Sequence, residues 1–354
     1  MKQKVLILDG SFAVKPLHDA LTKKYDVFTI GNDAKSYFAL KAPAKHYLID
    51  YSNLSEIKKH ITLNDFFEII PGCTDISLNT FSSINRNFRQ IVNDTITKKN
   101  FSDFCKHCGV KTPEIIENPG SKDLPIIVKP NDSFSGKGVS IVRTLPDLER
   151  AIKYASCNSE TNSYVCQKYI AGSLNSFSAF RCGSEIIIVN VHEENREGTF
   201  GVATSYCFDP DTQLKTKLHE IAHNFLYNRV KKLDYIHVQY ILHENNPYPI
   251  ELFLRCPGDI YPYLINLSTG IDYATLYCNG YLKEPLFIDQ SINHPKLITR
   301  KTLFAKNREE AVEQLNNYAE KEIFLTIDID KEFNSNDFVR FAVAFKHADS
   351  GKNE

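Results

Sequence analysis

The chain has 354 residues, of which 42% are hydrophobic and 24% charged, the balance of a globular protein with about two or three domains. Its 42 basic and 43 acidic side chains give a formal net charge of -1, which argues against nucleic acid or a membrane surface as a partner. No apolar run is long enough for a signal-peptide core or a membrane span, and the nine cysteines lack a disulfide spacing. We therefore expect a cytoplasmic protein with reduced thiols.

The first 92 residues alternate apolar strands with amphipathic helices. Strands are expected at 5–8, 27–30, 47–49 and 66–70, and helices at 13–24 and 54–61. This alternation predicts an α/β domain. The first loop, Asp9-Gly10-Ser11-Phe12-Ala13, lacks the G-x-G-x-x-G that brings a pyrophosphate to a helix N-terminus, which argues against a dinucleotide oxidoreductase.

A strand, a polar glycine loop and a second strand occupy residues 126–142. Gly136 and Gly138 allow the backbone of the loop to approach a ligand, and Lys129 and Lys137 supply positive charge. This is not a Walker loop, because the sequence G-x-x-x-x-G-K-[ST] is absent and a strand, not a helix, is expected after the glycines. The sequence thus predicts a phosphate-binding loop, with a solvated hairpin turn as the alternative.

Further motifs flank this loop. Thr97-Lys98 precedes a helix that ends at Gly109, in which Cys105 and Cys108 fall on the apolar stripe expected of core residues. Gln167-Lys168-Tyr169-Ile170 ends another apolar strand. A second hairpin then runs from 237 to 255, with a five-residue tip at 243–247.

This second hairpin predicts a specific pair of side chains. If Leu242 pairs with Tyr248, Gln239 stands directly opposite Glu251 on one face of the sheet. Strand alternation adds Phe253 and Arg255 to that face.

Taken in order, these motifs and the tail Pro257-Gly258-Asp259 … Thr269-Gly270-Ile271-Asp272 resemble the ATP-grasp superfamily over roughly residues 3–285. The resemblance is to its carboxylate–amine ligases, including L-amino-acid ligases and the biotin carboxylase and carbamoyl phosphate synthetase-like group. It implies an N-terminal parallel α/β domain at 1–92 and a two-lobed ATP-grasp domain at 93–285, with a lid lobe at about 114–172. Residues 286–354 are expected to form a small α+β appendage, in which the sequence indicates no chemistry.

The resemblance also implies the site residues. Arg255 and Lys129 are the expected catalytic residues, and Glu251 and Gln239 the expected metal ligands. The expected ATP-binding residues are Lys98, Lys129, Ser135, Gly136, Lys137, Gly138, and, at the adenine hinge, Gln167, Lys168, Tyr169 and Ile170. An alternative interpretation is that Lys98 lies on the surface in a first helical turn, or that Glu251 and Arg255 form an intrastrand ion pair.

The function implied is an ATP-dependent, ADP-forming ligase that joins a carboxylate to an amine through an acyl phosphate. Its cofactors would be ATP and Mg²⁺, with Mn²⁺ as a substitute. Its partners would be small amino-acid-like carboxylate and amine substrates, and the chain could act as a monomer or as a homodimer. Three positions depart from the family pattern: Gln239 replaces an acid, Phe253 an asparagine, and Leu174 a ribose-binding glutamate. These departures favour the alternative, a degenerate ATP-grasp domain that binds nucleotide or a metabolite without turnover.

Overall fold

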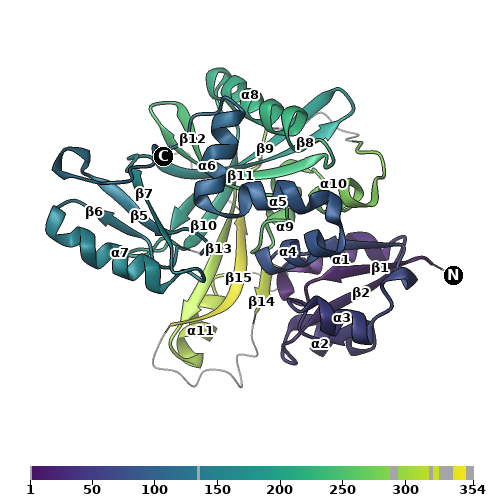
Figure 1. Ribbon diagram of the computed structural model, residues 1–354. Helices are drawn as coiled ribbons and strands as arrows, with labels where there is room; N and C mark the ends of the chain where they lie inside the picture. Colours follow the sequence, from purple (N-terminus) through teal and green to yellow (C-terminus); the bar gives the residue numbers. More distant parts are fainter. Residues whose placement is uncertain (1, 134–135, 288–293, 319–321, 327–337, 348–354) are drawn as a thin grey trace.

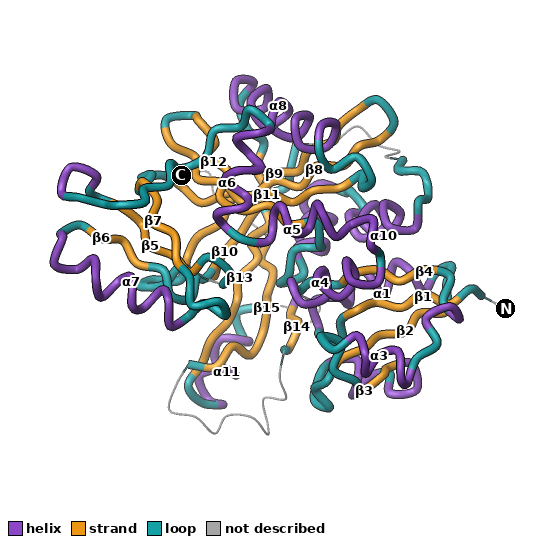
Figure 2. Tube along the Cα trace, viewed as in Figure 1, coloured by secondary structure: helices purple, strands orange, loops and turns teal. Residues whose placement is uncertain are grey.

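A computed structural model describes residues 2–133, 136–287, 294–318, 322–326 and 338–347, and this part of the chain contains three β-sheets (Figures 1 and 2). In Figure 1 the N-terminal sheet lies at the right and the smallest sheet at the left, with the largest sheet between them. No helix in the described ranges is both long and apolar enough to cross a membrane.

The N-terminal sheet is parallel, with the strand order β3-β2-β1-β4. Its strands are β1 (Lys4–Leu8), β2 (Asp26–Gly31), β3 (His46–Leu48) and β4 (Glu68–Pro71), and its helices are α1 (Lys15–Thr22), α2 (Tyr37–Lys41), α3 (Leu54–His60) and α4 (Asp75–Ile84). Residues 5–8 of β1 are fully buried, as expected for the inner strand of a parallel sheet. The expected α/β domain is confirmed.

A small antiparallel sheet, β6-β5-β7, forms a lobe with its own core. Helices α5 (Arg89–Ile96) and α6 (Lys98–His107) lead to β5 (Ile126–Pro130), β6 (Ser140–Val142), α7 (Leu148–Cys157) and β7 (Tyr164–Lys168). The apolar side chains of β5 pack against α7, in a cluster separate from the main core. We call this sheet and α7 the lid.

The largest sheet is antiparallel and has the order β12-β11-β8-β9-β10-β13-β15-β14. Its strands are β8 (Ser173–Cys182), β9 (Glu185–Asn195), β10 (Val202–Phe208), β11 (Tyr235–His243), β12 (Asn246–Phe253), β13 (Ile298–Ala305), β14 (Ile323–Leu325) and β15 (Val339–His347). Its helices are α8 (Thr212–Asn228), α9 (Tyr261–Thr269), α10 (Tyr273–Leu282) and α11 (Arg308–Leu315). The C-terminal region thus has the expected strands and helix, and its strands extend this sheet.

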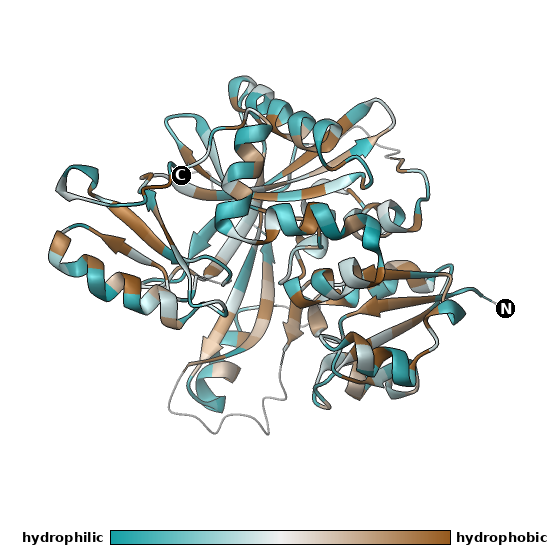
Figure 3. Ribbon diagram, viewed as in Figure 1, coloured by the Kyte–Doolittle hydropathy of each residue, from teal (hydrophilic) through white to brown (hydrophobic). Residues whose placement is uncertain are grey.

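One continuous core joins the N-terminal domain to the largest sheet. Helix α10 links them: the hydroxyl of Tyr277 donates to the carbonyl of Pro71 at 3.0 Å, and α1 packs against α10. Figure 3 shows hydrophobic residues most continuously on the strands of the N-terminal sheet, at the right, and many hydrophilic residues on the outer helices. The lid, whose core is separate, packs as a unit of its own.

Candidate active site

The β11–β12 hairpin places Gln239 opposite Glu251, as the sequence predicts. The expected five-residue tip is wrong, because the strands turn through 244–245 alone, two residues with positive φ. Leu242 consequently pairs with Pro247, one residue earlier than expected. A β-bulge next to Gln239 takes up the extra residue and restores the predicted pairing at the site.

Lys98 connects the lid to this hairpin. Its Nζ donates to the carbonyl of Ser133, in the loop after β5, at 2.8 Å, and lies 3.2 Å from Glu251 Oε1. Helix α6 starts here because Thr97 caps it, and the Lys98 amide donates to the carbonyl of Asn131 at 3.0 Å. The Lys98 side chain is 10% exposed, so it is not a simple surface lysine; its contact with phosphate stays a prediction.

Lys129 lies near the end of β5 and is 7% exposed. Burial is the main cause that lowers the pKa of Lys129 to about 8, and repulsion from Lys98 adds to it. The carboxylate of Glu251 raises this pKa in part. Within the described residues its Nζ has no hydrogen-bond or ion-pair partner. A buried cation without a partner is unfavourable, so an anion is the ligand this position favours.

The glycine loop has the backbone that its sequence requires. Gly136 and Gly138 have φ of +71° and +74°, a region that favours glycine. A Cβ on Gly136 would lie 2.4 Å from the Phe200 Cβ, so the loop approaches the chain between β9 and β10 closely. Lys137 is exposed, and Ser135 lies outside the described residues. The phosphate-binding role of this loop stays a prediction.

The expected adenine hinge follows β7. The amides of Lys168 and Tyr169 are already used: they donate to the carbonyls of Glu114 at 2.9 Å and Pro125 at 3.2 Å. The Ile170 amide has no acceptor in the described part of the protein, which leaves it for a base. Gln167 is buried, and its Nε2 donates to the carbonyl of Pro113 at 3.3 Å, so its side chain supports the strand.

Glu251 and Gln239 are suitable for a magnesium ion that also binds phosphate. A carboxylate and an amide carbonyl are hard oxygen ligands, and Mg²⁺ in such sites completes its shell with water and substrate phosphates. The described residues contain no cluster of three or more His, Cys, Asp or Glu side chains with metal-site geometry. Glu251 and Gln239 would leave most of the coordination shell to water and the nucleotide phosphates.

Solved structures match the chain over almost its full length. An L-amino acid ligase from Bacillus licheniformis superimposes with a TM-score of 0.75 at 16% identity, covering 98% of this chain and 94% of that one. An N5-carboxyaminoimidazole synthetase from Staphylococcus aureus, complexed with ADP, gives 0.77 at 15% identity, with 99% and 94% covered. A biotin carboxylase from Campylobacter jejuni gives 0.72 at 15% identity, with 98% and 88% covered. The chain has the ATP-grasp fold.

Sequence comparisons give a weaker signal in the same direction. No family model matches the chain. A carbamoyl phosphate synthase large chain from Pseudothermotoga lettingae is 22% identical over 210 residues, 56% of this chain and 19% of the relative. One from Lachnoclostridium phytofermentans is 22% identical over 178 residues, 49% and 16% respectively. The chain thus spans less than a fifth of the length of these relatives. The fold and the resemblance to ATP-grasp proteins are confirmed; the roles of individual site residues stay predictions.

Sequence reasoning missed an acid on β9 of the ATP-grasp sheet. Glu193 is 2% exposed and accepts hydrogen bonds from Ser176 Oγ at 2.6 Å and Gln239 Nε2 at 2.8 Å. Burial raises the pKa of Glu193, although these donors, Tyr261 and Arg300 act in the opposite direction. Only the register of β11 with β8, and of β8 with β9, reveals this contact.

Arg255 faces the N-terminal domain rather than Glu251. Its Nε lies 2.6 Å from Asp75 Oδ1, at the start of α4, and its Nη1 donates to the carbonyl of Cys256 at 3.2 Å. Its guanidinium lies over the Phe253 ring, 4.5 Å from the centroid. The alternative of a Glu251–Arg255 ion pair is therefore wrong, because Glu251 pairs with Lys98 and Arg255 with Asp75.

Sequence reasoning also missed Arg300, a fully buried residue of β13. Its Nη2 lies 2.9 Å from Asp259 Oδ2 and its Nη1 donates to Ser205 Oγ at 3.1 Å. Asp259 and the next residue, Ile260, have φ of +58° and +51°, a strained conformation for side chains of this size. Arg300 thus fixes the turn that starts α9, next to the active-site hairpin.

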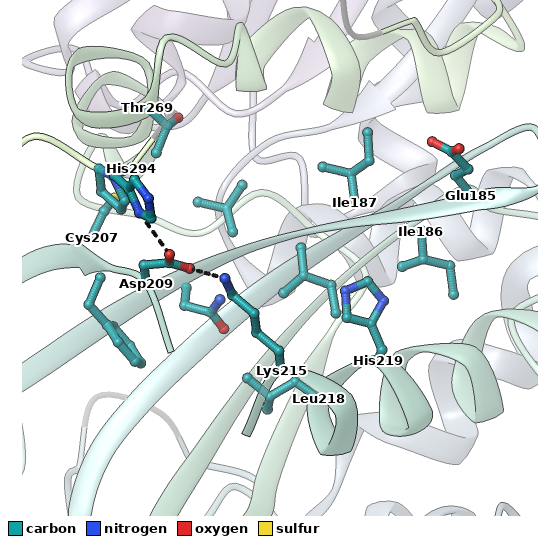
Figure 4. A pocket seen from close by; sticks show the side chains of 15 residues that line it. Glu185, Ile186, Ile187, Cys207, Asp209, Lys215, Leu218, His219, Thr269 and His294 are labelled. Carbon is teal, nitrogen blue, oxygen red and sulfur yellow. Dashed lines mark hydrogen bonds and ion pairs between the residues drawn. The ribbon is translucent and has the colours of Figure 1, made fainter. Parts of the chain in front are cut away.

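A cavity of about 520 Å³ lies elsewhere, between β9, the end of β10 and α8. Figure 4 shows Asp209 beside Lys215 and His294, with Nζ and Nδ1 at 2.6 and 3.0 Å from its two carboxylate oxygens. None of the predicted ATP or metal residues lines this cavity. The contacts around Lys98 and Glu251, and not the volume of this cavity, therefore define the candidate active site.

Proposed function

We propose that the protein is an ATP-dependent, ADP-forming carboxylate–amine ligase that binds MgATP between the lid and the largest sheet. One observation carries this proposal: two lysines, Lys98 and Lys129, meet a single carboxylate, Glu251, where the lobes face each other. Two cations face one carboxylate there, and Lys129 has no hydrogen-bond or ion-pair partner among the residues that the structure describes; both features favour a phosphate-bearing ligand. The fold and the ADP-bound N5-carboxyaminoimidazole synthetase support a nucleotide as that ligand.

In the proposed reaction a substrate carboxylate oxygen attacks the γ-phosphorus of ATP, the bond to the β-phosphate oxygen breaks, and ADP leaves. The amine of the second substrate then attacks the acyl carbon, phosphate leaves as the C–N bond forms, and the amine nitrogen loses a proton. Lys98 and Lys129 neutralise the charge of the transferring phosphoryl group. Glu251 and Gln239 would hold Mg²⁺, which supplies further neutralisation of the phosphate oxygens.

Arg255 is placed to bind a carboxylate oxygen of a substrate. Asp75 and the Cys256 carbonyl occupy its Nε and Nη1, so in the described part of the chain Nη2 remains for a substrate oxygen. Asp75 follows β4, at the carboxyl edge of the parallel sheet, where ligands of open α/β sheets bind. An amino-acid-like substrate with a carboxylate suits this position.

The second candidate is an ATP-grasp domain without turnover. Phe253 favours it, because a phenyl ring replaces an expected metal-binding amide and lies against Arg255. ADP release by the purified protein, measured with Mg²⁺, ATP and pooled amino acids and carboxylates, decides between the two. A ligase sustains ADP formation only when a carboxylate and an amine are both present, because the amine must discharge the acyl phosphate before the next turnover. Nucleotide binding without any ADP formation would favour the second candidate.

A further inference from the structure

Glu193, which is buried, and Gln239, which is partly buried, form a contact between two strands that are not neighbours. Glu193 is on β9 and Gln239 on β11, and Ser176 of the intervening β8 donates to Glu193 Oε1 at 2.6 Å. Gln239 Nε2 donates to the other oxygen, Oε2, at 2.8 Å. Both carboxylate oxygens of Glu193 thus accept hydrogen bonds from polar side chains of β8 and β11, the next two strands in the sheet order.

This contact determines which end of the Gln239 amide faces the metal. Gln239 Nε2 donates to Glu193 Oε2, so the amide turns its nitrogen, and not its oxygen, toward Glu193. The oxygen of a planar amide lies on the opposite side of Cδ from the nitrogen. Because β9 and β12 lie on opposite sides of β11, Gln239 Oε1 is turned away from Glu193, and Glu251 stands on the other side of Gln239.

We propose that Glu193 is a positioning residue of the metal site, which orients the Gln239 carbonyl oxygen for a divalent cation shared with the nucleotide phosphates. This inference rests on the proposed function of the same site. Groups that hydrogen-bond to metal ligands and fix their orientation commonly change metal affinity about 10- to 100-fold when they are replaced.

The same contact explains why residue 239 is an amide where the family pattern has an acid. A carboxylate at 239 would stand beside the carboxylate of Glu193 at hydrogen-bond distance, and two like charges so close are unfavourable. Gln239→Glu alone should therefore weaken the site. Exchanging the two groups, in Glu193→Gln with Gln239→Glu, keeps one amide and one carboxylate in contact and moves the charge to residue 239.

The test measures Mn²⁺ binding by electron paramagnetic resonance, in the presence of a non-hydrolysable ATP analogue, for full-length wild type and variants. We expect Glu193→Gln to raise the Mn²⁺ dissociation constant about tenfold or more, because an amide has only one acceptor oxygen for the two donors, Ser176 and Gln239, and its NH₂ group can instead draw the Gln239 oxygen toward residue 193. Nucleotide affinity in the presence of a chelator should stay unchanged. The exchange variant should return Mn²⁺ affinity to within a few-fold of wild type.

Glu194→Gln is the matched control. It makes the same charge change one residue along β9, on the opposite face, where the side chain is exposed. It should leave Mn²⁺ affinity unchanged.

The outcomes separate this inference from the proposed function. Equal Mn²⁺ affinity in Glu193→Gln and wild type, with the analogue bound, overturns the inference and leaves the nucleotide site standing. A weakened Glu193→Gln without recovery in the exchange variant also overturns it, since Glu193 would then act through packing alone. If Glu193→Gln does not fold, the exchange variant decides by the same criterion. A wild type that binds no analogue removes the proposed function and this inference together.

Discussion

Replacing Lys129 by methionine should stabilise the free protein while abolishing nucleotide binding. Lys129 is buried beside Lys98, and no described group accepts a hydrogen bond from its ammonium. Methionine has nearly the same length and no charge, so it removes the buried cation without opening a large cavity. A residue that opposes folding and serves a ligand predicts opposite effects on stability and binding.

The magnitude follows from the pKa. A fall from 10.5 to about 8 corresponds to about 3 kcal/mol of unfavourable burial of the charged form, at about 1.36 kcal/mol per unit. Below pH 8 this penalty is fully present, and it is relieved between about pH 8 and 10.5, where the unfolded chain binds more protons. Lys129→Met at neutral pH should therefore gain up to about 3 kcal/mol in free energy of unfolding.

Thermal unfolding with and without MgATP analogue measures both effects. Without nucleotide, Lys129→Met should melt several degrees above wild type. With the analogue at about 100 times its Kd, wild type gains about 2.7 kcal/mol and the variant gains nothing. Lys153→Met, an exposed lysine on α7 of the lid, is the control and should behave as wild type in both conditions. A variant that melts at or below wild type without nucleotide, or keeps its response to the analogue, would refute the assignment of Lys129.

The remaining predictions concern the charges of the same site. Glu251→Gln should abolish Mg²⁺-dependent ADP formation without unfolding the protein, because an amide is a poor ligand for Mg²⁺. The control variant Glu244→Gln, at the exposed hairpin tip, should keep full activity. Equal activity of the two variants would contradict the metal role of Glu251. ATP affinity should fall by up to about tenfold per pH unit as the pH rises above about 8, because Lys129 loses its proton there. Calorimetry at several pH values measures this change. A flat profile would show that Lys129 does not contact phosphate. Phe253→Asn should tighten Mn²⁺ binding in the presence of an ATP analogue, because an amide oxygen replaces the ring; unchanged affinity would place residue 253 outside the metal's reach.

Local patterns were sufficient to predict the two hairpins, β5–β6 and β11–β12; the phosphate roles of Lys98 and Lys129 stay predictions. The alternation of side chains on β11 and β12 and the polar tip between them place Gln239 and Glu251 on one face whatever the rest of the sheet does. Even there the turn was predicted wrongly, because the length of a hairpin loop and a bulge can shift register by compensating amounts. Pairing at the site survived because the two shifts cancelled.

Long-range pairing explains what the sequence did not reveal. Glu193 is followed by Glu194, and two adjacent acids at the end of an apolar strand suggest a solvated terminus. Only the strand order shows that Glu193 faces Gln239 across β8. Arg300 lies in a region where the sequence indicated no chemistry, and its role depends on Asp259, 41 residues earlier. Contacts of this kind have no local periodicity to predict them.

The departures from the family pattern argue for a rearranged ligase more than for a domain that has lost its chemistry. The Gln239 amide has a buried partner in Glu193, and the Phe253 ring supports Arg255, which Asp75 holds in turn. Lys129 is the decisive residue. A protein that bound no phosphate would gain about 3 kcal/mol by losing this charge, a large share of the roughly 5–15 kcal/mol that keeps a typical domain folded. Because no described group forms a hydrogen bond or ion pair with Lys129 Nζ, and Glu251 offsets the burial only in part, the remaining counter-charge is expected from a ligand. The phosphates of ATP are the anion that the fold, Lys98 and Glu251 together favour.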